Sequence, residues 1–259
     1  TFSPHPEHIL RPTIFPGLIT PNTIKFPILQ NHGVDIIINE KFSKKFASLN
    51  RDYFIENILN KHLKIKSIVI GYDFGFGKDI KWDAEYLAQY CLSNGISVVR
   101  VNPKILNNKT ISSTSIRKHI ANAEFDKVSK YLGRNYCFSG KVIRGNGLGS
   151  KIGIPTANIN IDGFVVPKYG VYAGIVLLDN KRFKAISYIG KRPTLDNGNP
   201  ILEIHIFDFN ENIYNKNIEF YFYKFIREEM KFLNLALLRE GIEKDIKKAK
   251  LMLKNLISW

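Results

Sequence analysis

The spacing of apolar side chains changes near Gly133. Before it, short β-branched runs alternate with segments in which apolar residues recur every three or four positions, as in amphipathic helices. The runs predict strands at 34–38, 67–70 and 96–101, and the helical spacing predicts helices at 50–63, 82–92, 113–121 and 124–131. Strands separated by helices predict a doubly wound, Rossmann-like α/β domain whose parallel sheet is covered on both faces.

Pro27 lies within a further segment of helical pattern. Proline has no amide hydrogen, and its ring clashes with the carbonyl four residues earlier. It therefore predicts that this helix is broken or begins late.

After Gly133 the apolar runs follow one another without long helices between them. They predict strands at 137–143, 170–178, 183–189, 201–207 and 218–225, with Gly, Asn and Pro at the turns. Repeated short strands of this kind predict an antiparallel β-barrel. A final helix follows Asn234, its expected cap, because apolar residues from Leu235 to Leu253 form one stripe that would pack on the barrel. We therefore divide the chain into residues 1–133 and 134–259.

Composition places the chain among soluble globular proteins. Hydrophobic residues make up 44% of the 259, the mean hydropathy is −0.13, and apolar runs fall short of the ~18 residues that a membrane helix needs. Cys91 and Cys137 lie in different predicted domains, so they are expected to be buried free thiols in a reducing cytoplasm. No membrane contact is expected, and no feature indicates an oligomer.

The formal net charge of +15, from 38 basic and 23 acidic side chains, is a pattern often found in nucleic-acid-binding proteins. The lysines are spread along the chain, however, and the densest basic stretch, 244–254, is expected to be the solvated face of the last helix. Nucleic acid is therefore not expected as a partner. A basic enzyme would instead attract anionic substrates.

A glycine-rich segment follows the first strand of the second domain. Its four glycines are Gly145, Gly147, Gly149 and Gly153. Glycine allows close approach to the main chain, and successive amides in such a loop bind phosphate. Thr156 and Asn158 follow at once and carry the oxygen donors that suit a hard cation such as Mg²⁺. The segment lacks the Gly-Lys-Ser/Thr ending of a Walker A loop, and the alternative is a surface loop between two strands.

The strand predicted at 201–207 carries a candidate general base. Alternation places Leu202, Ile204 and Ile206 on one face and Glu203 with His205 on the other. Glu203 is then either a base for a hydroxyl nucleophile or an exposed acid. His205 is a weaker candidate for that role and is expected instead to be a neighbour whose hydrogen bonds are satisfied.

The first domain offers a second anion site. Ser112, Ser113 and Thr114 precede a predicted helix that carries Arg117 one turn in. Hydroxyls, amides at a helix start and a guanidinium together favour phosphate, although Ser/Thr caps without a ligand are common.

Five segments, in this order, resemble those of riboflavin kinases. They are the glycine loop with Pro-Thr-Ala-Asn (155–158), Gly-Val-Tyr-Ala (170–173), Ile-Gly-Lys-Arg-Pro-Thr (189–194), Leu-Glu-Ile-His (202–205) and Arg-Glu-Glu-Met-Lys-Phe (227–232). The resemblance implies that the glycine loop, Thr156 and Asn158 bind ATP and its metal, and that Glu203 is the catalytic base. It also implies flavin contacts for Arg192, Thr194 and Arg227; a surface salt bridge is the alternative for Arg227.

The first half resembles the FMN adenylyltransferase (FAD synthetase) module of the bacterial bifunctional enzymes. The matching segments are Thr-Phe-Ser-Pro-His-Pro (1–6), Gly-Tyr-Asp-Phe-Gly-Phe-Gly (71–77) and Ile-Ser-Ser-Thr-Ser-Ile-Arg (111–117). The resemblance implies an adenylyltransferase site with His5, Asp73, Ser112, Ser113, Thr114 and Arg117. The alternative for residues around Asp73 is a turn anchored by Phe74 and Phe76.

One departure from that family lies at the N-terminus. The family's opening strand, Gly-x-Phe-Asp-Gly-x-His-x-Gly-His turn and helix do not precede Thr1. Because that element would hold the triphosphate in the transition state, we expect FAD formation by this chain to be strongly impaired.

Together the resemblances imply a two-domain enzyme that phosphorylates riboflavin to FMN with ATP and a divalent metal, with FMN adenylylation to FAD as the second family activity. The rival hypothesis is a non-catalytic protein: a flavin- or nucleotide-binding module, or a basic barrel that binds RNA. The barrel strands lack the interleaved basic and aromatic pattern of stacking platforms, which argues against RNA.

Overall fold

The computed structural model describes residues 1–72, 74, 84–191, 200–254 and 256. By internal contacts the chain forms two compact units: Thr1–Phe15 with Val34–Ile111, and Pro16–Gly33 with Ser112–Trp259. We call them the N-terminal unit and the barrel unit. These units do not coincide with the division at residues 133/134, which stays a prediction about the two functional modules.

The N-terminal unit contains short elements around two parallel strand pairs. Its strands are β1 (Phe2–Ser3), β2 (Glu40–Lys41), β3 (Ser67–Gly71), β4 (Ser97–Val101), β5 (Ile105–Leu106) and β6 (Lys109–Thr110). β1 pairs with β2 and β3 with β4, both in parallel, whereas β5 and β6 form a hairpin that the sequence pattern did not predict.

The helical segments of this unit are short. They are α1 (Pro6–Leu10), η1 (Pro12–Ile14), α3 (Lys44–Ala47), α4 (Arg51–Tyr53), η2 (Phe54–His62) and α5 (Ala84–Ser93), and η2 and α5 contribute to a small apolar core. The predicted helix at 50–63 is confirmed, with the Asn50 side chain accepting from the Asp52 amide, but its second part is a π-helix. Ile55, Leu87 and Cys91 are buried together, and Phe74 packs against them.

The strand predicted at 34–38 is wrong. This run is not assigned to a strand; Val34, Ile36 and Ile38 are exposed, and strand structure begins only at Glu40. Among the described residues no neighbouring strand runs along it, and the Thr1 ammonium donates to the Ile38 carbonyl at 2.8 Å. A β-branched run forms a strand only where a partner completes the hydrogen-bonded ladder.

The prediction from Pro27 is also wrong. Helix α2 (Asn22–Asn31) runs through Pro27 without a break and begins at Asn22. Pro27 is its sixth residue, so the missing amide affects only the bond to the carbonyl of Thr23 in the first turn. The helix tolerates that single loss.

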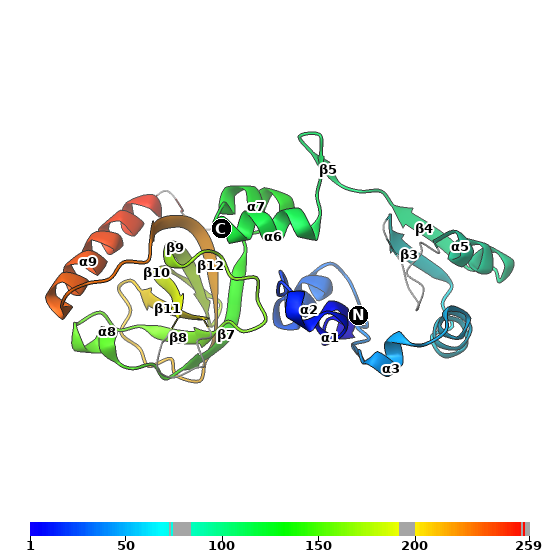
Figure 1. Cartoon of the computed structure of the whole chain (residues 1–259), viewed down its shortest axis with the longest axis horizontal. Helices are drawn as coiled ribbons and strands as arrows, with labels where there is room; N and C mark the ends of the chain where they lie inside the picture. The colour runs from blue at the N-terminus through cyan, green and yellow to red at the C-terminus, as the bar shows by residue number, and fades with distance from the viewer. Residues whose placement is uncertain (73, 75–83, 192–199, 255, 257–259) are drawn as a thin grey trace. The chain divides into compact units, whose positions relative to one another are not determined.

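The barrel unit is a closed, six-stranded antiparallel barrel with helices outside it (Figure 1). Its strands are β7 (Cys137–Ile143), β8 (Ala157–Asn160), β9 (Gly170–Leu178), β10 (Lys181–Lys191), β11 (Pro200–Ile206) and β12 (Asn217–Glu228). Their order around the barrel is β10-β11-β8-β7-β12-β9, and β9 pairs again with β10. The predicted strands are confirmed, whereas β8 was not among them.

Two helices that the sequence pattern assigned to the first domain group with the barrel. They are α6 (Ser113–Ala121) and α7 (Phe125–Leu132), which ends at Gly133 in a left-handed conformation. Phe125 stacks on Phe222 with ring centroids 4.9 Å apart, and both side chains are buried. The aromatic core of the barrel therefore fixes α7 in place.

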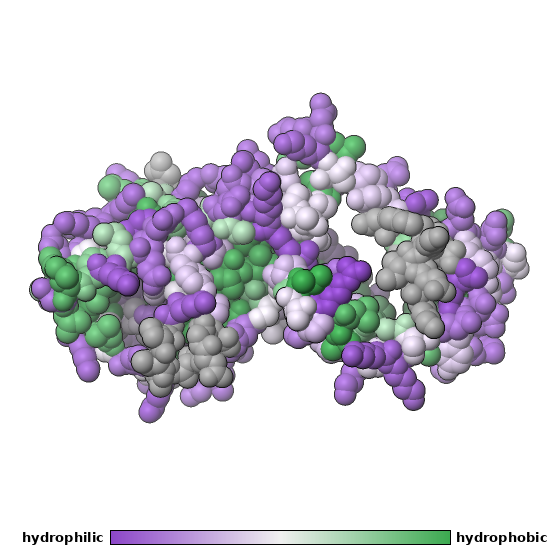
Figure 2. Space-filling view, in the orientation of Figure 1, coloured by the Kyte–Doolittle hydropathy of each residue, from purple (hydrophilic) through white to green (hydrophobic). Residues whose placement is uncertain are grey.

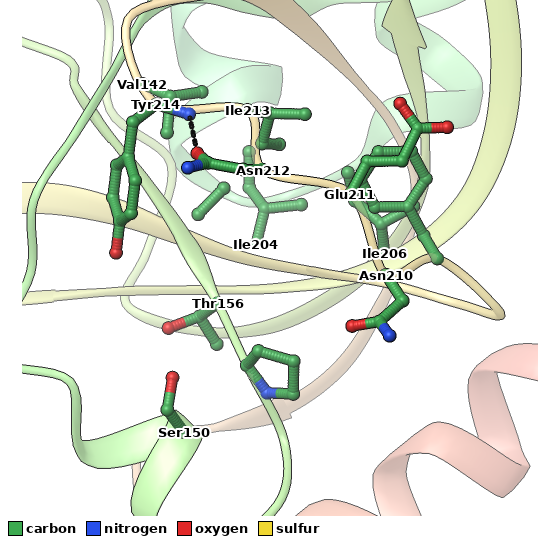
Figure 3. A pocket seen from close by; sticks show the side chains of 13 residues that line it. Val142, Ser150, Thr156, Ile204, Ile206, Asn210, Glu211, Asn212, Ile213 and Tyr214 are labelled. Atoms are coloured by element: carbon green, nitrogen blue, oxygen red, sulfur yellow. Dashed lines mark hydrogen bonds between the residues drawn. The ribbon is translucent and has the colours of Figure 1, made fainter.

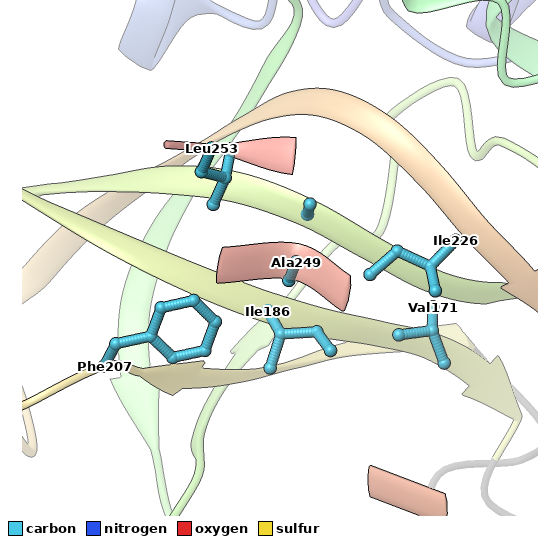
Figure 4. Close-up of a cluster of buried hydrophobic side chains, with 7 residues drawn as sticks. Val171, Ile186, Phe207, Ile226, Ala249 and Leu253 are labelled. Carbon is cyan, nitrogen blue, oxygen red and sulfur yellow. The ribbon is translucent and has the colours of Figure 1, made fainter. Parts of the chain in front are cut away.

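Helix α9 (Leu235–Met252) packs on the outside of the barrel, as predicted. Asn234 caps it by accepting from the Leu237 amide at 2.9 Å. Figure 4 shows the contact, in which side chains from the outer face of the barrel meet the helix. The buried members of this cluster are Val171, Ala173, Ile186, Phe207, Ile226, Ala249 and Leu253. We call it the outer cluster.

Both cysteines are buried free thiols, as expected. Burial raises the pKa of the Cys137 thiol to about 12, so it stays protonated. Figure 2 shows hydrophilic residues distributed over the visible face of each unit. Among the described residues, helices long and apolar enough to cross a membrane are absent.

Candidate functional site

The glycine loop connects β7 to β8 and contains one short helix, α8 (Leu148–Lys151). Gly147 and Gly153 have φ of 68° and 78°, in the left-handed region that favours glycine. The amides of Lys151 to Ile154 donate to carbonyls inside the loop. Any phosphate must therefore meet the amides of the earlier part, Gly145–Ser150. Gly153 shapes the turn, and its contact with ATP stays a prediction.

Gly149 lies where the loop closes on itself. The Ile154 amide donates to the Gly149 carbonyl at 2.8 Å. A Cβ on Gly149 would lie 2.3 Å from the carbonyl oxygen of Ile154 and 3.2 Å from the hydroxyl of Thr156. Only glycine allows this approach between the loop and the Pro-Thr-Ala-Asn turn.

Gly149→Ala should therefore open the loop. The added methyl must displace a backbone carbonyl, which moves Thr156, so kcat/KM for ATP is expected to fall by roughly 10²-fold. Steady-state kinetics of the reaction that the resemblance implies, the formation of FMN from riboflavin and ATP, measure the effect. The control is Gly163→Asn, because a side chain at Gly163 would face open space and Asn tolerates the positive φ (80°) of that position. Equal behaviour of the two variants would contradict this role of Gly149.

Three of the predicted site residues converge where β8 meets β11. Asn158 is directly opposite Glu203 in the antiparallel pairing, and Thr156 precedes Asn158 by two residues. Directly opposite residues share a face, with Cβ atoms about 5 Å apart. Asn158 is buried and Glu203 half-buried. The sequence placed these side chains in separate motifs; the strand register brings them together.

A pocket of about 350 Å³ includes Thr156 in its lining, whereas Asn158 and Glu203 are not among the residues that line it (Figure 3). Ser150 and Thr156 line it on the side of the glycine loop, and residues 209–214 line the opposite side. The apolar side chains of Val142, Ile204 and Ile206 also line it. A pocket with apolar walls and hydroxyls next to a glycine loop suits a nucleotide base with its phosphates. The sequence pattern did not point to the 209–214 segment.

His205 fixes the turn that carries Thr156. Its Nδ1 lies 2.8 Å from the carbonyl oxygen of Pro155, so a proton on Nδ1 is donated to that carbonyl. This agrees with the expectation of a hydrogen-bonded neighbour rather than a base.

Tyr188 and Glu229 are functional candidates that sequence reasoning missed. Tyr188 is directly opposite Glu203 on β10, and its hydroxyl donates to the Glu229 carboxylate. Burial, followed by this hydrogen bond, raises the pKa of Tyr188, so the phenol remains a neutral donor. Neither residue was expected to carry chemistry from its place in the sequence, and the pairing register alone identifies Tyr188.

Arg227 is engaged within the protein. Its Nε lies 3.1 and 2.9 Å from the two carboxylate oxygens of Asp245 on α9, and its guanidinium carbon lies 5.6 Å from the centre of the Phe232 ring. Asp245 is buried. The structure thus gives Arg227 a role in joining β12 to α9, and its contact with a flavin stays a prediction.

The remaining adenylyltransferase candidates divide between the two units. Ser112 caps α6 in a capping box with Ser115, and Ser113 and Thr114 lie in the first turn, where Thr114 is exposed. The Arg117 Nε donates to the Gly17 carbonyl at 3.3 Å. These residues belong to the barrel unit.

His5 belongs to the N-terminal unit, where it caps α1 by accepting from the Glu7 amide and stacks on Phe15. Three predicted residues, Asp73, Arg192 and Thr194, lie outside the described residues. Within those residues, clusters of three or more His, Cys, Asp or Glu that could hold a metal are absent.

Comparison with known proteins covers both halves of the chain. The riboflavin kinase family model matches residues 132–253, and the FAD synthetase family model matches residues 1–115. The kinase match thus begins in the last turn of α7, just before the barrel.

Curated relatives match over nearly the whole chain and are named bifunctional riboflavin kinase/FMN adenylyltransferase. The relative from Buchnera aphidicola subsp. Schizaphis graminum is 38% identical over 95% of this chain and 80% of its own. Those from Haemophilus influenzae and Escherichia coli K12 are 39% and 32% identical, over 87% and 94% of this chain and 74% and 78% of theirs.

A solved structure entitled macrolide-efflux protein from Streptococcus pneumoniae has the same fold. Its TM-score is 0.80 at 30% identity, and the match covers 96% of this chain and 82% of the other.

Proposed function

The chain belongs to the bifunctional riboflavin kinase/FMN adenylyltransferase family, and from this premise we propose a function for each of its parts. The part matched by the riboflavin kinase model transfers the γ-phosphate of ATP to the 5′-hydroxyl of riboflavin and gives FMN. The part matched by the FAD synthetase model transfers AMP from ATP to FMN and gives FAD and pyrophosphate. We place the boundary between these modules at residues 133/134.

The observation that supports the kinase site best is the pairing of Asn158 with Glu203 beside the glycine loop. In this proposal Gly145, Gly147 and Gly149 admit the phosphates to the backbone amides, and Gly153 shapes the turn. Glu203 accepts the proton of the riboflavin hydroxyl as that oxygen bonds to the γ-phosphorus. The bond from the γ-phosphorus to the bridging oxygen breaks, and ADP leaves.

The donor set suits Mg²⁺. The Thr156 hydroxyl and the Asn158 amide oxygen are hard oxygen donors, and Mg²⁺ in phosphoryl-transfer sites takes few protein ligands and completes its shell with phosphates and water. When bound there, it would neutralise charge that develops on the phosphate oxygens.

For the flavin, we propose contacts with Arg192, Thr194 and the segment that begins at Arg227. For adenylyl transfer we propose His5, Asp73, Ser112, Ser113, Thr114 and Arg117. Hydroxyls in the first turn of α6 support this, because helix amides there attract phosphate. The two buried free thiols support a cytoplasmic location.

The test is direct. Purified protein with riboflavin, ATP and Mg²⁺ should form FMN and ADP in equal amounts, which chromatography quantifies by fluorescence for FMN and by ultraviolet absorbance for ADP. FAD and pyrophosphate release from FMN and ATP measures the second activity separately. A folded sample that makes no FMN at saturating substrates would overturn the kinase assignment.

A further inference from the structure

A single row of side chains crosses the outer face of the barrel. Asn158 pairs with Glu203, Glu203 with Tyr188, Tyr188 with Val171, and Val171 with Arg227. All four pairings are antiparallel, so the five side chains lie on one face. At one end of the row are the proposed metal ligand and base, and at the other is the arginine bound to α9. Tyr188 stands in the middle.

The Tyr188 ring occupies space that is open because residue 190 is a glycine. A Cβ on Gly190, two residues along the same strand, would lie 2.0 Å from the Tyr188 hydroxyl oxygen and 2.3 Å from the ring carbon that carries it. The tyrosine ring therefore lies along β10 over the space that a side chain at 190 would fill. Gly190 belongs to the Ile-Gly-Lys-Arg-Pro-Thr segment. A side chain at this position would clash with the Tyr188 ring, which gives a structural reason for the glycine.

The far end of the ring reaches the segment after β12. The hydroxyl donates to Glu229, which directly follows the last residue of that strand. The ring also packs against the outer cluster, and this apolar contact fixes its position on the barrel. Tyr188 thus connects its own strand, Glu203 opposite it, and the Arg-Glu-Glu-Met-Lys-Phe segment.

From this arrangement we propose that Tyr188 is a positioning residue of the kinase site. Through its hydrogen bond to Glu229 it holds segment 228–232 beside Glu203, so that riboflavin binds with its hydroxyl at the base. The inference rests on the proposed kinase function. Tyr188 and Gly190 act together in it, since Gly190 provides the space and Tyr188 provides the link.

The link has a clear kinetic signature. Removing the Tyr188 hydroxyl leaves Glu203, the glycine loop and the ATP contacts in place. The variant should therefore lose affinity for riboflavin, the phosphoryl acceptor, and not for ATP. Tyr188→Phe is expected to raise KM for riboflavin about 5- to 10-fold, the effect of losing one ordinary hydrogen bond, because Glu229 is exposed and solvent weakens the bond to its charge. KM for ATP and kcat should remain within about twofold of the wild type. Tyr221→Phe is the matched control, because Tyr221 is also half-buried on the barrel and donates to a glutamate, Glu219, away from this row.

Two further variants separate positioning from general stability. Glu229→Ala should raise the riboflavin KM as Tyr188→Phe does, and the double variant should be no worse than either single one, since both remove the same bond. Gly190→Ala should also raise it, but in a Tyr188→Ser background the same methyl should change KM by less than about twofold, because the ring it would strike is gone.

Several results would overturn the proposal: a riboflavin KM unchanged in Tyr188→Phe, an equal rise in KM for ATP, additive effects of Tyr188→Phe and Glu229→Ala, or an equal effect of Tyr221→Phe. Equilibrium binding of riboflavin in the presence of MgADP, followed by flavin fluorescence, is measured on the same proteins. If the wild type makes no FMN, the kinase assignment fails, and this binding assay still decides whether Tyr188 and Glu229 act together on flavin.

Discussion

Glu203→Gln is expected to lower the turnover of riboflavin phosphorylation by ~10²–10⁴ while ATP binding survives. Glutamine keeps the shape of the side chain opposite Asn158 and Tyr188 but cannot accept the proton of the attacking hydroxyl. The glycine loop and Thr156 are unchanged, so the nucleotide should still bind. Single-turnover kinetics and calorimetric titration with the non-hydrolysable ATP analogue AMP-PNP and Mg²⁺ measure the two quantities on one sample.

Two further variants are needed to interpret this result. Glu219→Gln removes a barrel carboxylate that accepts from Tyr221 and lies outside the row, so its turnover should stay within about twofold of the wild type. Thr156→Ala should show the opposite pattern from Glu203→Gln, with weaker binding of the metal–nucleotide complex. Near-normal turnover in Glu203→Gln would mean that another group is the base.

The parts of the fold that the sequence predicted best are those whose pattern is strong and local. Strands β7 and β9 have long alternating or wholly apolar runs, and α6 directly follows Ser112, which caps it in the structure. Elements α8 and β8, with four residues each, are too short to establish a period. The run at 34–38 failed for the opposite reason: its β-branched pattern was clear, but a strand also needs a partner.

The candidate site divides in the same way. The chemistry of the loop glycines, Thr156 and Glu203 can be inferred from their residue types. The meeting of Asn158 with Glu203 depends on strand register, and register depends on packing around the whole barrel. Tyr188 is chemically ordinary in the sequence and gains its place only from being opposite Glu203 and above Gly190. The partner of Arg227 could not be predicted from the sequence either, since Asp245 lies 18 residues away on a helix.

Burial distinguishes the Arg227–Asp245 pair from the other ion pairs of α9. The Asp245 side chain is 9% exposed and that of Arg227 is 22% exposed, and Arg227 Nη2 lies 2.7 Å from the carboxylate. Lys250 also pairs with a carboxylate outside the helix, at 3.3 Å, but its partner Asp208 is 85% exposed. Solvent screens the second pair and not the first, so only the first should contribute strongly to stability.

Asp245→Asn is therefore expected to destabilise the barrel unit by about 3 kcal/mol, because it leaves a largely buried guanidinium without a counter-charge and turns an amide donor toward it. For a unit of this size that corresponds to a fall in Tm of about 6–12 °C, which differential scanning calorimetry can measure. Asp208→Asn, the matched control on the exposed pair, should change the stability by less than about 0.5 kcal/mol. Replacing both partners, as Arg227→Met with Asp245→Leu, should cost less than Asp245→Asn alone, since no charge is then left buried. If Asp245→Asn is as mild as Asp208→Asn, α9 is held by the outer cluster and not by the ion pair, and Arg227 is then available to the flavin.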